Sequence, residues 1–270
     1  MSITTSISCL ILSDTHNEWP YSADHLAPKA DILIHCGDLT QYGGLPSFKR
    51  AIDNINSMDA ELKLVIAGNH DVDPDPAWLQ KFAEDDNDVE IGAKCLSLMK
   101  SQQHHGTHYL DEGVHSFALK DGRSFKVYAT PYTPEFGEFA FLYGEDEDKF
   151  NEGVNVVLEG VDIVMSHGPP TFPMFPNYKL DINRQGKHCG CGKLAKAVQR
   201  AKPKLCCFGH IHEGRGVAKI YWAAESLVQV AADGNAIEVS KSGIENVDET
   251  LLVNAAILGN SKGWMVNITL

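Results

Sequence analysis

The sequence predicts an α/β protein, and two features of its pattern support that class. Five short apolar segments read as buried strands, and each stops at a polar residue that can bind a metal. Between several of them lie segments whose apolar residues recur at helical spacing. Alternation of strands and helices is typical of sheets covered by helices, so we expect that architecture here.

The five predicted strands end in similar ways. They cover 7–12 before Ser13-Asp14, 31–35 before Gly37-Asp38, 62–67 before Gly68-Asn69-His70-Asp71, 162–165 before Ser166-His167, and 204–208 before Gly209-His210. In open α/β sheets, ligands collect at the carboxyl ends of strands, so these five ends predict one convergent site.

Three helices are predicted over 45–58, 77–84 and 193–201, the first with Pro46 near its start. Asp121-Gly122, between Phe117-Ala118-Leu119 and Phe125-Lys126-Val127, predicts a β-hairpin. The length of 270 residues suits one large domain or two modest ones. Because no low-complexity linker interrupts the chain, we expect one domain over 1–270.

A formal charge of −13 argues against a general electrostatic grip on nucleic acid or on an anionic membrane. It does not exclude a phosphate substrate, because bound dications would be the largest local charges in the site. No apolar run approaches the roughly 18 residues of a membrane span, and the N-terminal residues lack the basic cluster of a secretory signal. We therefore expect a cytoplasmic protein.

Seven cysteines form an irregular, odd set that suits reduced thiols packed in a core. Cys189-Gly190-Cys191 could act as a metal clip, but it lacks a second spaced pair, so loop and core packing is favoured. Asn267-Ile268-Thr269 fits a glycosylation acceptor, yet a C-terminal strand is the simpler interpretation.

The strand-end residues share one chemistry, since they offer nitrogen and oxygen ligands and no sulfur. Asp14-Thr15-His16 places two ligands two positions apart, and His210-Ile211-His212 does the same with imidazoles. A carboxylate such as Asp38 can bridge two dications, which an imidazole cannot do. Each motif alone is more often a cap or a turn, but together they match a dinuclear centre able to clamp an in-line displacement.

The ordered set Asp14-Thr15-His16, Gly37-Asp38, Gly68-Asn69-His70-Asp71, His167 and Gly209-His210-Ile211-His212 resembles the calcineurin-like metallophosphoesterase superfamily. The flanks, such as Ser166-His167-Gly168-Pro169-Pro170, resemble its small metallophosphoesterase-domain proteins of the brain-expressed animal type. The resemblance runs from about residue 7 to 215 and implies a four-layer αββα sandwich of two mixed sheets flanked by helices.

The resemblance also implies site roles. Two divalent ions would bind, with Mn or Fe/Zn favoured, although the ligand types do not separate Mn, Fe, Zn, Co and Mg. His70 would assist as a proton donor beside the centre while a hydroxide or water between the metals attacks phosphorus. The implied metal ligands are Asp14, His16 and His212 for one ion, Asn69, His167 and His210 for the other, and Asp38 as the bridge.

Three features of the sequence, compared with the superfamily pattern, affect the expected activity. Gln41 and Tyr42 stand where many relatives carry an Asp that orients the catalytic His and an Arg that grips phosphate. A dianionic monoester would lose a cationic contact there, which favours a phosphodiester substrate. His210 is retained, whereas some nearly inactive animal relatives lack it. The segment 217–247 looks like an insertion that could form a hairpin, a lid or a contact surface.

These observations predict a metal-dependent phosphodiesterase that acts on small or cyclic nucleotides. A phosphomonoesterase, including a protein phosphatase, and a non-catalytic scaffold that binds metal or nucleotide remain as alternatives. The expected partner is a small phosphoester, and the oligomeric state is not readable from the sequence. Besides Asn69, candidate substrate contacts are Tyr42, His188, Glu213 and Arg215, the last because arginine can bind phosphate bidentately.

Overall fold

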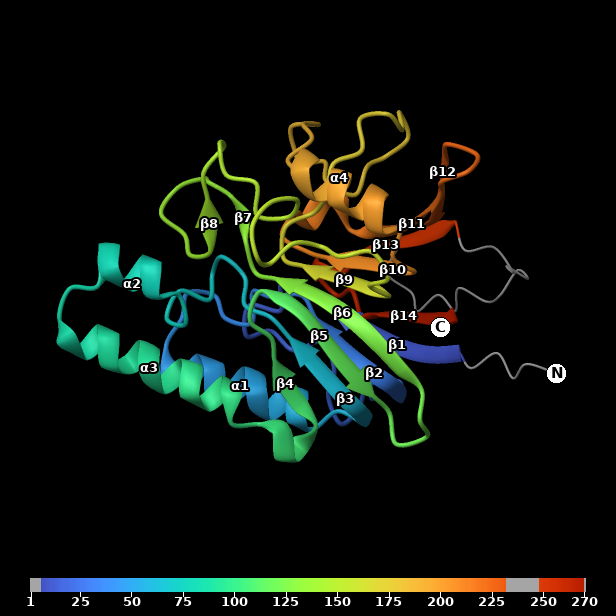
Figure 1. Ribbon diagram of the computed structural model, residues 1–270. Coiled ribbons are helices and arrows are strands. Elements are labelled where there is room, and N and C mark those ends of the chain that lie inside the picture. Colours follow the sequence, from blue (N-terminus) through green and yellow to red (C-terminus); the bar gives the residue numbers. More distant parts are fainter. Residues whose placement is uncertain (1–5, 232–247, 270) are drawn as a thin grey trace.

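Two β-sheets pack face to face in this computed structural model, which describes residues 6–231 and 248–269 (Figure 1). The first sheet has the order β14-β1-β2-β3-β4, with bounds Trp264–Thr269, Ser6–Leu12, Ala30–His35, Ala60–Val65 and Thr107–Tyr109. The strands from β1 to β4 run parallel, and β14 pairs antiparallel with β1. The five predicted strands are present, with ends shifted by at most two residues.

The second sheet has the order β12-β11-β13-β10-β9-β6-β5. Its strands are Ser226–Ala231, Gly216–Tyr221, Glu249–Asn254, Leu205–Phe208, Ile163–Ser166, Ser124–Thr130 and Gly113–Ala118. The predicted hairpin at Asp121-Gly122 is confirmed, since β5 and β6 pair antiparallel around it. The short strands β7 (Thr133–Pro134) and β8 (Leu142–Tyr143) form a separate pair.

The helices cover the outer faces of the sheets. They are α1 (Leu45–Asn56), α2 (Pro76–Phe82), α3 (Asp86–Lys100) and α4 (Gly192–Ala201), with short 3-10 turns at Gln103–His105 and His212–Gly214. Helices α1 and α3 pack on the first sheet, and α4 packs on the second (Figure 1). The expected four-layer αββα sandwich is therefore confirmed.

Alternation along β1 shows how the layers form. Cys9 and Ile11 point into the core between the sheets, whereas Leu10 and Leu12 point toward α1 and α3. Successive side chains of a strand face opposite sides, so a continuous apolar strand can serve two cores at once. This packing of the two sheets holds the carboxyl ends of β1, β2, β3, β9 and β10 in fixed positions relative to one another.

Helix α3 is absent from the sequence prediction. Asp85 caps its first turn by accepting from the backbone N–H groups of Asn87 and Asp88. Its buried face consists of Gly92, Cys95 and Met99, which recur at helical spacing. Because two of these three residues are small, the apolar periodicity is too weak to reveal the helix in the sequence.

Three further sequence features find their places in the fold. Cys191 caps α4, since its Sγ accepts from the backbone N–H of Leu194, while Cys189 is exposed. Asn267 lies in β14. Of the segment 217–247, the first part forms the β11–β12 hairpin beside β13, and 232–247 lie outside the described residues. No helix of the described residues has the length and apolarity to cross a membrane.

Candidate metal centre

The seven predicted metal ligands lie on five loops that follow β1, β2, β3, β9 and β10, and the structure brings these loops together. Contacts between the sheets close the site. The His167 Nδ1 donates to the carbonyl of Cys36 at 2.8 Å, and the backbone N–H of His210 donates to Asp14 Oδ2 at 2.9 Å. The site therefore straddles the junction of the two sheets.

Strained backbone turns aim several of these side chains. Asp14, His16, Asp38 and His210 have φ values of 56°, 44°, 55° and 67°, in the left-handed region that non-glycine residues rarely adopt. Backbone hydrogen bonds hold the turns, such as the one from the Asp14 N–H to the Gly37 carbonyl at 2.9 Å. Strain of this kind collects at functional sites, where the surrounding fold maintains it.

One group of ligand atoms joins the first and last motifs of the chain. Asp14, His16 and His212 each offer an atom, and these atoms all lie within 4.8 Å of one another. The Asp14 Oδ1 lies 3.4 Å from the His212 Nε2, and the rings of His16 and His212 stack at 5.5 Å between centroids. This geometry suits one metal ion.

A second group lies beside the first and consists of Asp14, Asp38 and His167, again within 4.8 Å. The two oxygens of Asp38 face different groups, since Oδ1 lies 3.4 Å from the His167 Nε2 and Oδ2 lies 3.8 Å from the His16 Nε2. The Asn69 Oδ1 lies 2.8 Å from the same nitrogen of His167, and the His210 ring lies 5.1 Å from the His167 ring. Both Asp14 and Asp38 are thus placed between the groups.

Three of the histidines are oriented by backbone carbonyls. The Nδ1 atoms of His16, His167 and His212 lie 3.1, 2.8 and 2.9 Å from the carbonyl oxygens of Thr40, Cys36 and Ile257. A carbonyl only accepts, so Nδ1 carries the proton and donates. The Nε2 atom is then the one available to a metal, which is the usual arrangement around metal-binding imidazoles.

The buried charges of the site perturb one another. Burial opposes ionisation of Asp14, but the hydrogen bond from His212 and the charge of His167 outweigh it and hold its pKa well below the usual range. Burial also favours neutral His167, yet the charge of Asp38 prevails and raises its pKa to about 9. Burial lowers the pKa of His210 to about 4, so that its ring is a neutral ligand. Buried carboxylates in this setting favour a compensating cation.

Glycines let the loops approach one another. A Cβ on Gly209 would lie 2.1 Å from Asp14 Oδ2, and one on Gly68 would lie 2.3 Å from Asp38 Oδ1. Both distances are shorter than any tolerable contact, so only glycine allows these carboxylates to sit against the neighbouring loops.

His70 lies beside the clustered ligands rather than among them. Its Nδ1 donates to the carbonyl of Gln41 at 2.7 Å, and its ring meets the His16 ring edge-on at 4.8 Å. Gln41 therefore orients His70 through its backbone, at the position where many relatives use a carboxylate side chain. The Nε2 of His70 stays available for proton transfer.

Asp71 ties two of the ligand loops together, a role that the sequence analysis does not assign. Its carboxylate accepts from the backbone N–H groups of Leu39, Thr40 and Gly68 at 3.1, 2.9 and 2.9 Å, and from the Thr40 hydroxyl at 2.8 Å. Burial, aided by the charge of Asp38, raises the pKa of Asp71 to about 6. An Asp two positions after a predicted ligand was the available signal.

We expect Asp71→Asn to lower the free energy of unfolding by roughly 2–4 kcal/mol, because the new amide NH₂ would face backbone N–H donors that have no other partner. Urea unfolding of the metal-free variant measures the change. Asp59→Asn is the matched control, since Asp59 is exposed and pairs only with Lys29 at the surface. Equal unfolding midpoints for the two variants would contradict the role of Asp71.

Two of the candidate substrate residues make their contacts elsewhere. The Arg215 guanidinium donates to the carbonyls of Ala256 and Lys262 and lies over the Trp264 ring. The His188 Nδ1 lies 2.7 Å from an oxygen of buried Asp181. These contacts serve packing and loop order, and they leave the Arg215 guanidinium little capacity to bind phosphate.

The other two candidates are placed differently. Glu213 pairs with Arg184 at 2.5 Å and, with Arg215, lines a cavity of about 650 Å³ beneath β12. Tyr42 is 59% exposed and meets the Trp78 ring edge-on at 6.2 Å. Glu213 directly follows His212 in the chain and Tyr42 lies four positions after Asp38, but both contact residues outside the predicted ligand set.

Two phenylalanines that the sequence analysis does not assign lie against the site. The Phe139 ring lies 4.8 Å from the His70 ring, and the Phe136 ring lies 5.1 Å from the His210 ring. Both belong to the loop between β7 and β8, far from every ligand motif in the sequence. The only available signal was a short run rich in phenylalanine.

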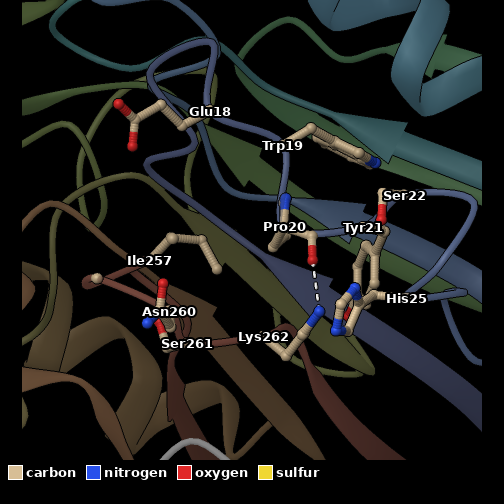
Figure 2. Close-up of a pocket in the computed structure, with 11 residues that line it drawn as sticks. Glu18, Trp19, Pro20, Tyr21, Ser22, His25, Ile257, Asn260, Ser261 and Lys262 are labelled. Atoms are coloured by element: carbon tan, nitrogen blue, oxygen red, sulfur yellow. Dashed lines mark hydrogen bonds between the residues drawn. The ribbon is translucent and has the colours of Figure 1, made fainter.

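A cavity of about 520 Å³ lies beside the site (Figure 2). Trp19, Tyr21 and His25 line it, and the Lys262 ammonium donates to the Pro20 carbonyl at 2.7 Å within it. Ile257, whose carbonyl accepts from the His212 Nδ1, also lines it. Glu18, two positions after the predicted ligand His16, lines the cavity as well.

The donor set fits divalent metal ions. Among residues 6–231 and 248–269, the only groups of at least three His, Cys, Asp or Glu with suitably close ligand atoms are the two around Asp14. They contain carboxylates and imidazoles without thiolate, a set that accepts several divalent metals.

Comparison with known proteins agrees with this geometry. The family model described as calcineurin-like phosphoesterase matches residues 7–214. Metallophosphoesterase domain-containing protein 1 of Homo sapiens and of Mus musculus is 31% identical over 212 residues, which cover 76% of this chain and 60% of the relative. The chain thus spans about three fifths of these curated relatives.

Two further matches have different extents. A protein of Emericella nidulans named probable rhamnogalacturonate lyase C is 30% identical over 218 residues, which are 80% of this chain but 18% of that protein. A solved crystal structure superposes with a TM-score of 0.52 at 16% identity, covers 83% of this chain and 90% of its own, and supports the fold alone. Because the family model matches most of the chain and the clustered carboxylates and histidines occupy its strand ends, the chain belongs to the calcineurin-like phosphoesterase family.

Proposed function

We propose that this protein is a metal-dependent hydrolase of phosphodiesters and that small or cyclic nucleotides are its substrates. The observation that carries the proposal is the cluster of two buried carboxylates and four histidines with His70 beside it. Membership of a phosphoesterase family supports hydrolysis of a phosphoester. The same proposal places the protein in the cytoplasm, where its free cysteines would stay reduced.

The proposed ligands divide between two divalent ions, with Mn or an Fe/Zn pair favoured. Asp14, His16 and His212 would hold one ion, Asn69, His167 and His210 the other, and Asp38 would lie between them. When bound, such ions stabilise negative charge on the phosphoryl group and on the attacking and leaving oxygens. The close ligand atoms around Asp14 support this division.

His70 is proposed to give a proton to the leaving oxygen. The hydrogen bond from its Nδ1 to the Gln41 carbonyl fixes the ring and directs Nε2 away from that carbonyl. Histidine is the side chain that most often serves as a positioned general acid or base.

The missing phosphate-binding cation favours a diester over a monoester. Tyr42 stands at the position of the arginine that would supply it, and Arg215 is engaged with two backbone carbonyls and the Trp264 ring. A diester carries one negative charge rather than two, so it needs this contact less.

Hydrolysis by the Mn²⁺-loaded protein of bis(p-nitrophenyl) phosphate and of p-nitrophenyl phosphate tests the proposal, followed by 2′,3′- and 3′,5′-cyclic nucleotides. We expect a higher kcat/KM for the diester. Faster turnover of the monoester would instead support a phosphatase. Absence of hydrolysis with either class, together with tight nucleotide binding, would support a non-catalytic scaffold.

Metal binding is also expected to release a proton. In the metal-free protein His167 has a pKa of about 9, so at pH 7.5 its ring is protonated and a cation at Nε2 must displace that proton. The apparent affinity should therefore rise roughly tenfold per pH unit up to about pH 9. Titration calorimetry in buffers of different ionisation enthalpy counts the protons, and the release should decrease as the pH rises through about 9. No release at pH 7.5 would remove His167 from the ligand set.

A further inference from the structure

We propose that Phe136 and Phe139 form an aromatic platform on which the base of a nucleotide stacks while its phosphate occupies the metal centre. The inference rests on the proposed function, and it adds the part of the site that would recognise the substrate beyond its phosphate. The two rings lie 5.0 Å apart at an interplanar angle of 31°. We call these two residues the aromatic platform below.

The position of the platform suits a nucleotide. The Phe139 ring lies 4.8 Å from the His70 ring, and the Phe136 ring lies 5.1 Å from the His210 ring. The platform therefore borders both the proposed proton donor and a proposed metal ligand. A base joined to phosphate through one sugar ring must lie beside the centre and not within it, which is where these rings are.

The exposure of the platform also points to a ligand. Phe136 is 37% exposed, and Phe139 is only partly buried. Scattered exposed apolar side chains are ordinary, but two adjacent rings that also contact the imidazoles of a site are not scattered. Flat rings of this kind stack on nucleobases with little dependence on the base identity.

The loop that carries the platform is held in place on several sides. The pairing of β7 with β8 closes its ends, where the N–H of Thr133 donates to Phe141 and that of Glu135 to Tyr143 at 2.9 and 3.0 Å. At its tip the Trp78 Nε1 donates to the carbonyl of Glu138 at 3.0 Å.

The same loop is fastened to a predicted ligand, because the Ala140 N–H donates to the backbone carbonyl of Asn69 at 3.0 Å. The backbone of the loop is thus held before any ligand arrives, which reduces the entropy lost on binding. Movement of the loop would also disturb the backbone at Asn69.

Charge limits the kind of nucleotide that fits. The platform is flanked by exposed Glu135 and Glu138, and the chain carries a net charge of −13. Additional phosphates along a polynucleotide would be repelled by these carboxylates. We therefore assign the platform to a mononucleotide or a cyclic nucleotide and not to a nucleic-acid strand.

The cavity around Trp19 and Tyr21 is the competing place for a base (Figure 2). Its lining includes Glu18 and Ile257 but neither His70 nor any of the seven predicted metal ligands. The platform rings, by contrast, lie directly against the rings of His70 and His210. This proximity favours the platform over the cavity.

Titration calorimetry of the Mn²⁺-loaded protein with AMP and with ribose 5-phosphate tests the platform, because the two ligands differ only in the base. We expect AMP to bind roughly 5- to 100-fold more tightly. In the double variant Phe136→Leu/Phe139→Leu the side chains stay apolar but lose their flat rings. The affinity for AMP should therefore fall to that for ribose 5-phosphate, whereas the affinity for ribose 5-phosphate should be unchanged. Phe117→Leu is the matched control, since its ring lies on β5 against Phe125, and it should behave as the wild type.

Three results would overturn the platform. They are equal binding of both ligands by the wild type, no measurable AMP binding, and a preference for AMP that survives in the double variant. In the last case, loss of the preference in Trp19→Leu would place the base in the cavity of Figure 2. Binding needs no turnover, so a protein that hydrolyses nothing yet shows the expected pattern would refute the proposed hydrolysis and keep the platform.

Discussion

Asp38→Asn is expected to weaken the binding of both metal ions at once, with each affinity falling at least ~10-fold. Removal of a residue that only hydrogen-bonds to a metal ligand already lowers metal affinity by about that factor. The two oxygens of Asp38 face His167 at 3.4 Å and His16 at 3.8 Å, one histidine from each proposed set. Asparagine removes the buried charge and offers only one oxygen. Metal content after dialysis, measured by elemental analysis, gives the result.

The same measurement on Asp59→Asn, a surface change of identical chemistry, supplies the baseline. Far-ultraviolet circular dichroism checks that both variants keep the fold. If Asp38→Asn retains two ions with unchanged affinity, Asp38 is not the bridge. Asp14 would then be the better candidate, because it belongs to both groups of close ligand atoms.

His70→Ala is expected to retain both metals and to lower kcat by roughly 10²–10⁴-fold, the usual effect of removing a positioned acid. His70 contacts the cluster through the edge of its ring and through its backbone N–H, which donates to Asp38 Oδ1 at 2.8 Å. Alanine keeps that backbone donor. The loss of kcat should therefore be separate from any loss of metal.

Leaving-group dependence distinguishes proton donation from a structural role. A cyclic nucleotide expels an alkoxide that needs a proton, whereas p-nitrophenolate leaves without one. The deficit of His70→Ala should be large for the first substrate and small for the second, and His104→Ala should match the wild type on both. An equal deficit on both substrates would show that His70 acts in another way.

The fold was largely readable from local pattern. Each of the five strands is a mostly apolar run, with interruptions such as Lys63 in β3, because both faces of β1, β2, β3, β9 and β10 are largely buried. Such runs are visible without any knowledge of partners. Helix α1 was visible because Phe48, Ile52 and Ile55 are large and periodic. Helix α3 was not, because its buried face consists largely of the small residues Gly92 and Cys95.

The site divides along the same line. The ligand types and their positions at strand ends could be predicted from each motif separately. The structure brings all seven side chains to one place. The role of Arg215 was not legible, since its partners Ala256 and Lys262 lie more than 40 residues away in the chain. Adjacency to a motif indicated a phosphate contact, whereas the fold turns the guanidinium toward carbonyls and Trp264.

By itself the sequence determined the α/β pattern, the nitrogen and oxygen donor set, and the absence of the expected arginine at Tyr42. Only the tertiary structure decided that Asp14 meets His210 and His212, nearly 200 residues later, that Asp71 ties two loops, and that Phe136 and Phe139 border the centre. The local sequence pattern indicates which residues are buried and where the chain turns, because both are encoded by residues that are close together in the chain. Distances between side chains from different strands arise only when two sheets pack and bring their loops together.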